Sequence, residues 1–164
     1  MTTSRTLIIM RHAEAEAAPG LPDKQRPLTP KGATDAVAAA ASIVAAGLTP
    51  DRGITSSAQR TLETATALRK AFAAGTTWDE PRDDLYLSGL DVISRVLREP
   101  ECEDARTVLV LGHNPGFSAA VTHLVGAMTP LGTSEAAVVA TDAATWDEAL
   151  DKIGSWRLVR VVKP

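Results

Sequence analysis

Residues 6–13 read TLIIMRHA, an apolar run that ends in an arginine and a histidine. A second run, VLVLGHNP at residues 108–115, also ends in a histidine. Apolar runs without polar alternation predict strands that are covered on both faces, as in a parallel sheet between helices. We therefore expect two buried strands, with Arg11, His12 and His113 at or just past their carboxyl ends.

Helical patterns alternate with these strands. Thr29 and Pro30 predict a helix start, because threonine caps helices and proline fits the first helical position. This helix is expected to extend to about residue 46, and its apolar positions at helical spacing are Val37, Ala40, Ala41, Val44 and Leu48. Further helices are predicted near residues 58–73, 90–97 and 116–127, and further strands at 52–56, near Trp78, and at 136–141 and 156–162. The alternation predicts an α/β fold, with a mostly parallel sheet and helices on both faces.

Length and composition set further bounds. The 164 residues match the common size of one domain, and no linker or repeat divides them, so we expect residues 1–164 to form a single domain. The hydrophobic content of 45% supports a packed core, and the net charge of −3 gives no basic field for nucleic acid. No apolar run approaches the roughly 20 residues that span a bilayer. One cysteine, Cys102, cannot form an internal disulfide, and the N-terminus lacks a signal-peptide pattern. We expect a cytoplasmic protein with neither a nucleic-acid nor a membrane partner, and its oligomeric state stays open.

A third short run, at residues 52–56, is followed by the segment SSAQRTLETA at 56–65, which contains Arg60. In open α/β sheets, ligands bind at the carboxyl ends of strands. Two arginines and two histidines at that edge suit phosphate, because guanidinium forks bind phosphate oxygens and an imidazole nitrogen can attack phosphorus. The sequence therefore predicts a phosphate site with a nucleophile. The histidines lack carboxylate or thiolate ligands at metal-binding spacing, so neither a metal nor a cofactor is expected.

Three segments resemble the signatures of the histidine phosphatase superfamily, which also contains the cofactor-dependent phosphoglycerate mutases. They are RHAEA at residues 11–15, SSAQRTLETA at 56–65 and GHNP at 112–115. The short chain and the segment RPLTPKG at residues 26–32 most resemble the SixA-type branch, which dephosphorylates phosphohistidine. The resemblance covers about residues 5–128 and implies a phosphoglycerate mutase-like fold.

The resemblance also implies roles for single residues. His12 would be the nucleophile, and its other ring nitrogen is expected to donate to a backbone carbonyl, which fixes the tautomer. Arg11 and Arg60 would bind the phosphoryl oxygens, and His113, as an imidazolium, would complete the cradle. Asn114 is expected to add a donor. Arg26 is expected either to reach the phosphate from its loop or to remain a surface charge.

The proton donor is less well defined by the sequence. Mutase-like members place a glutamate after the third strand, and the comparable residues 79–87, DEPRDDLYL, lack the usual context. Asp84 and Glu80 are the candidates for this role. Phosphohistidine depends less on an acid, because its own nitrogen can be protonated before it leaves. The pattern therefore favours phosphohistidine over an alcohol phosphate. Ala13 follows His12, where many relatives have glycine.

We therefore expect a metal-independent phosphatase that works through a phosphohistidine intermediate on His12 and acts on a phosphorylated protein. One alternative is a small-molecule phosphomonoesterase. Another is a catalytically silent module that binds a phosphorylated partner. The intact His12 favours the enzyme, whereas the undefined acid favours the module. A phosphoglycerate mutase is disfavoured because the chain is short and the acid is undefined.

Overall fold

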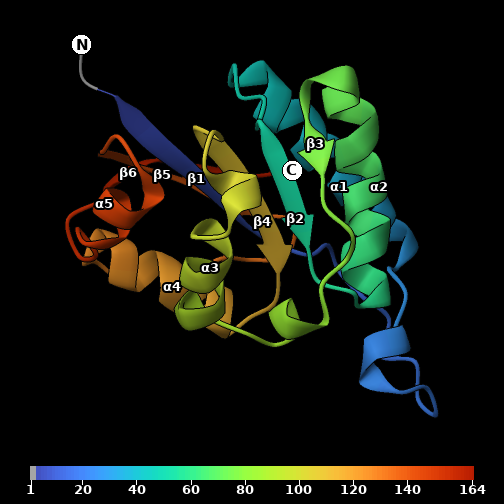
Figure 1. The fold of residues 1–164 in the computed structure, drawn as a ribbon. Coiled ribbons are helices and arrows are strands. Elements are labelled where there is room, and N and C mark those ends of the chain that lie inside the picture. The colour runs from blue at the N-terminus through green and yellow to red at the C-terminus, as the bar shows by residue number, and fades with distance from the viewer. Residues whose placement is uncertain (1–2) are drawn as a thin grey trace.

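A computed structural model describes residues 3–164, and one six-stranded sheet forms its centre (Figure 1). The strand order is β3-β2-β4-β1-β5-β6. The strands are β1 (Ser4–Arg11), β2 (Arg52–Thr55), β3 (Thr77–Trp78), β4 (Thr107–Gly112), β5 (Ala136–Asp142) and β6 (Arg157–Val162). The strands β3, β2, β4 and β1 pair in parallel, and β5 is antiparallel to both β1 and β6. Since only β5 runs against the others, the predicted mostly parallel sheet is confirmed.

Helices cover both faces of this sheet. They are α1 (Pro30–Ala45), α2 (Gln59–Phe72), α3 (Leu90–Leu97), α4 (Gly116–Val125) and α5 (Trp146–Leu150). Helices α1 and α2 pack on one face, and α3, α4 and α5 pack on the other (Figure 1). The predicted α/β architecture is therefore confirmed, with α5 as an unpredicted addition. Among residues 3–164, no helix combines the length and the apolar character needed to cross a bilayer.

The central strands are buried on both faces, as their apolar runs predict. In β1, Leu7 and Ile9 belong to the core under α3, α4 and α5, whereas Ile8 and Met10 belong to the core under α1 and α2. All four side chains are fully buried. The side chains of β4 divide between the two cores in the same alternating way. Because each face is a core, the middle of each strand is apolar, at residues 7–10 of β1 and 108–111 of β4.

The predicted inner face of α1 is confirmed for Ala40 and Leu48 and wrong for Val37, Ala41 and Val44. Val37 and Val44 are 62% and 44% exposed, and the buried residues are Gly32, Ala36, Ala39, Ala40 and Ile43. The predicted start of the helix is correct, because Oγ1 of Thr29 accepts the N–H of Gly32 at 2.9 Å. Small inward side chains let the helix approach closely. A Cβ on Gly32 would lie 2.1 Å from the carbonyl oxygen of Glu14, in the loop after β1.

Three strands end at the same edge of the sheet. Strands β1 and β4 end together, because Arg11 is the register partner of Gly112. The chain after β1 stays beside β4, since the N–H of His12 donates to the carbonyl of Gly112 at 3.1 Å. The chain after β2 does the same, since the N–H of Ser56 donates to the carbonyl of Leu111 at 3.1 Å. The residues that follow these three strands are therefore neighbours.

Gly112 brings the end of β4 against α4. A Cβ on Gly112 would lie 2.3 Å from Cζ of Phe117, whose ring is fully buried. We expect Gly112→Ala to destabilise the protein by about 1–3 kcal/mol, the usual cost of overpacking a core. Thermal denaturation measures this effect against Gly89→Ala, whose added Cβ would come no closer than 3.7 Å to another residue. Equal stability of the two variants would contradict the tight fit of Phe117.

Candidate functional site

The structure brings together the four residues that the sequence singles out. The rings of His12 and His113 have centroids 5.3 Å apart. Both histidines are buried, with exposures of 9% and 1%, and Arg60 is 3% exposed. Arg60 joins the pair directly, because its Nε–H donates to Nε2 of His12 at 3.2 Å. Arg11 precedes His12 at the end of β1, and its charge acts on the His12 ring.

The tautomer of His12 follows from its hydrogen bonds. Nδ1 lies 2.6 Å from the carbonyl oxygen of Ala13, which can only accept, so Nδ1 carries the hydrogen. Nε2 therefore holds a lone pair, which accepts the N–H of Arg60. Burial lowers the pKa of His12 to about 4; the bond to Ala13 opposes this shift, and the guanidinium charges of Arg60 and Arg11 add to it. The expected backbone hydrogen bond is confirmed, and the ring is neutral with Nε2 unprotonated.

The segment at residues 56–65 fixes the backbone around His12. The N–H of Ala13 donates to Oγ1 of Thr64 at 3.0 Å, and this hydroxyl donates to the carbonyl of Arg60 at 2.7 Å. The carboxylate of Glu63 accepts the N–H of Leu28 at 2.7 Å, which ties the far end of the same loop to α2. Besides supplying Arg60, the segment therefore holds the loop that carries the first histidine.

Ser56 determines the state of His113, a role that the sequence did not suggest. Its Oγ lies 2.8 Å from Nε2 of His113 and accepts the N–H of Ala58 at 3.3 Å. Among the described residues, Nε2 of His113 is the one acceptor for this buried hydroxyl, so Ser56 donates and the neutral ring carries its hydrogen on Nδ1. Burial lowers the pKa of His113 to about 3, and the charge of Arg60 adds to the shift. These contacts favour a neutral His113 with an N–H on Nδ1, in place of the expected imidazolium.

Polar atoms without partners in the described part of the chain occur on His113 and on two residues that are joined to His12 by the chain or by a backbone hydrogen bond. Within residues 3–164, Nε of Arg11, Nδ1 of His113 and Oγ of Ser134 are buried and make no hydrogen bond. Ser134 belongs to this group because its N–H donates to the carbonyl of His12 at 3.1 Å. Buried polar groups are nearly always paired, so unpaired donors on His113 and on residues joined to His12 are candidate contacts for a polar ligand. A guanidinium, an imidazole N–H and a hydroxyl are donors that suit an anion with several oxygens.

Two further predicted phosphate contacts have other partners. The Asn114 amide donates to the carbonyl of Leu131 at 2.9 Å, and its oxygen accepts the N–H of Ser118 at 3.1 Å. Asn114 therefore holds the loop before β5 against the start of α4.

Arg26 donates to the carbonyl of Glu16 at 2.7 Å and to Oδ1 of Asp23 at 2.9 Å. Arg26 is linked to the site through Asp23, which also binds Arg60, and its charge helps to lower the pKa of His12.

The structure does not bring the two candidate proton donors to the histidines. Asp84 is held by Arg82 and by Arg95, at 2.8 and 2.9 Å. These contacts, led by the hydrogen bond from Arg82, lower the pKa of Asp84, so it has no proton to donate. Glu80 lines a separate cavity of about 430 Å³. No hydrogen bond or ion pair within residues 3–164 joins either carboxylate to His12.

Asp23 is the carboxylate that does reach the site. It lies in a 3₁₀ turn in the loop after β1. Its backbone carbonyl accepts Nη1 of Arg60 at 2.7 Å, and its Oδ2 accepts Nη2 at 3.0 Å. The hydroxyl of Tyr86 donates to the same Oδ2. The hydrogen bonds from Tyr86 and Arg26 hold the pKa of Asp23 well below its usual range, so it is ionised.

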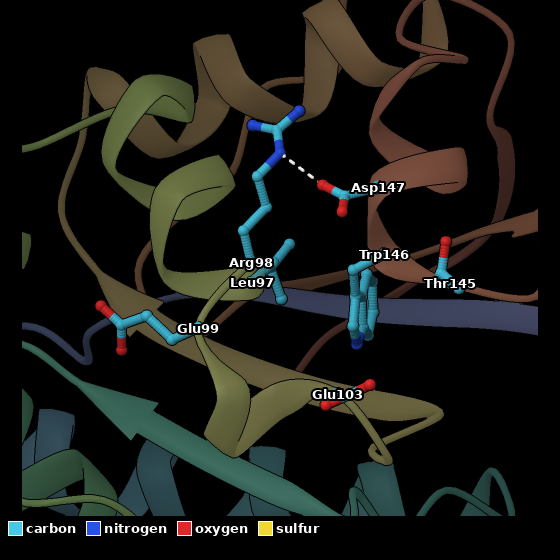
Figure 2. Close-up of a pocket in the computed structure, with 7 residues that line it drawn as sticks. All are labelled: Leu97, Arg98, Glu99, Glu103, Thr145, Trp146 and Asp147. Carbon is cyan, nitrogen blue, oxygen red and sulfur yellow. Dashed lines mark hydrogen bonds and ion pairs between the residues drawn. The ribbon is translucent and has the colours of Figure 1, made fainter.

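A separate hollow of about 270 Å³ lies between α3 and α5. Figure 2 shows Arg98 reaching from the end of α3 towards Asp147 on α5, with a distance of 2.8 Å between Nε and Oδ1. Trp146 contributes a buried ring, whose N–H donates to the carbonyl of Cys102 at 3.0 Å. None of the predicted site residues lines this hollow. It is therefore distinct from the histidine site.

The hydrogen bond from Ser56 predicts the position of one proton. In the wild-type protein, we expect the ¹⁵N chemical shifts of His113 to show a neutral ring with hydrogen on Nδ1. In Ser56→Ala, Nε2 loses its donor, so a share of the rings should carry hydrogen on Nε2. Ser57→Ala is the matched control, because this hydroxyl donates to Asp83 instead. A wild-type ring with hydrogen on Nε2 would contradict this role of Ser56.

Comparisons with known proteins agree with this geometry. The model of the histidine phosphatase superfamily (branch 1) matches residues 7–83. An uncharacterized chloroplast protein of Arabidopsis thaliana is 30% identical over 173 residues, covering 98% of this chain and 78% of that protein. A proposed phosphohistidine phosphatase SixA from Nakamurella multipartitia is 31% identical, with a TM-score of 0.80 and coverage of 98% and 96% of the two chains. A proposed SixA from Agrobacterium tumefaciens is 25% identical, with a TM-score of 0.76 and coverage of 100% and 99%. The chain therefore belongs to the histidine phosphatase superfamily and has its phosphoglycerate mutase-like fold.

Proposed function

We propose that residues 1–164 act as one phosphatase domain that transfers a phosphoryl group first to His12 and then to water. Membership of the superfamily supports phosphatase activity. The observation that carries the proposal is the state of His12: a neutral ring with its lone pair on Nε2, held beside Arg60. A buried nucleophile that stays unprotonated at neutral pH needs no separate base.

Each of the two steps makes one bond to phosphorus and breaks another. In the first step, the Nε2 lone pair of His12 forms the N–P bond, and the leaving group departs with the electron pair of its own bond to phosphorus. The ring is then cationic, with hydrogen still on Nδ1, and the carbonyl of Ala13 stabilises it. In the second step, water forms the new O–P bond and loses one proton to solvent. The electron pair of the N–P bond returns to Nε2.

The remaining site residues supply positive charge and donors. Phosphoryl transfer spreads negative charge over three oxygens, so catalysis depends mainly on positioning and electrostatic stabilisation. Arg11 and Arg60 would bind these oxygens through their guanidinium groups, and His113 would donate its unpaired Nδ1–H. Arg60 would exchange its bond to His12 for one to the phosphoryl group. Among the described residues, the unpaired donors of Arg11 and His113 are free before the ligand binds, whereas Arg60 changes partner.

We propose protein phosphohistidine as the substrate. The proteins from Nakamurella multipartitia and Agrobacterium tumefaciens, which this chain resembles along its whole length, are described as proposed phosphohistidine phosphatases. The local chemistry supports the same choice, because within residues 3–164 no hydrogen bond or ion pair joins Asp84 or Glu80 to the site residues. A phosphohistidine can carry its proton on its own ring before the bond breaks.

We also propose that the reaction needs neither a metal ion nor a cofactor and takes place in the cytoplasm, with no nucleic-acid or membrane partner. Guanidinium groups supply the charge that a metal ion supplies in other phosphoryl-transfer sites. Among the described residues, no group of three histidine, cysteine or acidic side chains could hold a metal ion. The single, buried Cys102 suits a reducing compartment.

Steady-state hydrolysis of an aryl phosphate in the presence of EDTA tests the proposal. We expect wild-type activity to survive the chelator and His12→Ala to lose several powers of ten in kcat, because it lacks the nucleophile. His123→Ala is the matched control, since His123 is an exposed residue of α4. A folded His12→Ala protein with more than about a tenth of wild-type kcat would reject His12 as the nucleophile. Activity restored only by added metal would reject the metal-free reaction, and phosphate binding without turnover would favour the silent module.

A further inference from the structure

The direction of attack determines which residues meet the leaving group. In-line displacement places the leaving group opposite the attacking atom, so it lies on the side of phosphorus away from Nε2 of His12. A phosphorylated substrate enters from solvent, so we place the mouth of the site where solvent-accessible residues contact Arg60 and His113. The residues at this mouth therefore contact the leaving group and can discriminate between substrates.

Asp23 and Tyr86 occupy this mouth. The Tyr86 ring meets the His113 ring edge-on, with centroids 5.3 Å apart, and lies 5.9 Å from Cζ of Arg60. Asp23 binds the outer nitrogens of the same guanidinium group, and its side chain is 46% exposed. Both residues thus touch the groups that would hold the phosphoryl oxygens, and both remain open to solvent.

We propose that Asp23 and Tyr86 form a leaving-group subsite, in which the Asp23 carboxylate accepts the ring N–H of a protonated phosphohistidine and Tyr86 packs against its imidazole. This inference rests on the proposed function and deepens it, because it names the residues that select the substrate class. The subsite would favour phosphohistidine over phosphate esters.

The chemistry of the leaving group explains this preference. A protonated phosphohistidine carries phosphorus on one ring nitrogen and hydrogen on the other. When the P–N bond breaks, its electron pair returns to the first nitrogen, and the ring leaves as neutral imidazole with its hydrogen in place. The enzyme supplies no proton, so an acceptor beside the ring is sufficient. An ester leaves through an oxygen that gains negative charge, which a carboxylate repels.

Asp23 has the capacity for this contact. A carboxylate offers about four lone-pair positions. Three of them have partners among the described residues: Arg26 on Oδ1, and Arg60 and Tyr86 on Oδ2. One position on Oδ1 is left, on a side chain that is 46% exposed. The same donors keep Asp23 ionised, so it acts as an acceptor and not as an acid.

The competing explanation is that Asp23 only orients Arg60. In that case, its removal would slow all substrates by the same factor, because each one needs Arg60. A subsite for the leaving group predicts a change in the ratio between substrates. The ratio of kcat/KM for two leaving groups therefore separates the two roles.

The experiment compares a phosphohistidine peptide with p-nitrophenyl phosphate. We expect Asp23→Asn to lower kcat/KM for the peptide, relative to the aryl ester, by about tenfold or more, the effect of losing one charge-assisted hydrogen bond. Tyr86→Leu should lower the same ratio through loss of the ring. Asp83→Asn is the matched control, because this nearby carboxylate pairs with Lys24 at 2.6 Å and should leave the ratio unchanged.

The outcomes distinguish this inference from the proposed function. An unchanged ratio in Asp23→Asn, or a wild-type enzyme that hydrolyses the ester but not the peptide, overturns the subsite and leaves the phosphatase in place. A wild-type protein that hydrolyses neither compound overturns the proposed function itself. A lowered ratio in Asp23→Asn together with an unchanged ratio in Asp83→Asn supports the subsite.

Discussion

The parallel pairing of β1 with β4 is the constraint on which the rest of the structure depends. Both strands have apolar middles that are buried on both faces, and the polar residues of the site follow these apolar runs. The register that pairs Arg11 with Gly112 makes the two strands end side by side. His12 and His113 therefore leave the sheet at the same edge, and their rings lie 5.3 Å apart. The geometry of the site is thus a consequence of how the core packs.

Burial also gives the two histidines complementary chemistry. Their pKa values are lowered to about 4 and about 3, so both rings are neutral at physiological pH. His12 donates a hydrogen bond from Nδ1 to the carbonyl of Ala13 and keeps a lone pair on Nε2. His113 accepts a hydrogen bond from Ser56 and keeps an N–H on Nδ1. One ring can therefore attack phosphorus while the other donates to the phosphoryl oxygens, and the positive charge comes from the arginines.

The sequence predicted the parts of the fold and site that carry a strong local signal. Long apolar runs identified the central strands, and the polar residues at their ends identified the two histidines and two arginines. The inner face of α1 was not predictable from Val37 and Val44, because its inward positions are small residues that let it pack closely.

Asp23 lies in a proline-flanked loop and contacts an arginine 37 positions away, so nothing nearby in the sequence reveals it. Ser56 lies within the segment at residues 56–65 that resembles a family signature. Its sequence position does not indicate that its hydroxyl binds Nε2 of His113. Asp84 stood at a suitable place in the chain, yet two arginines bind it.

The central claim is that Nε2 of His12 is the atom that attacks phosphorus. The most direct test traps the phosphorylated enzyme by rapid mixing with an aryl phosphate and assigns the modified nitrogen by ³¹P and ¹⁵N NMR. We expect a single phosphoryl group on Nε2 of His12, with hydrogen retained on Nδ1. A phosphoryl group on Nδ1 of His12, or on His113, would contradict it.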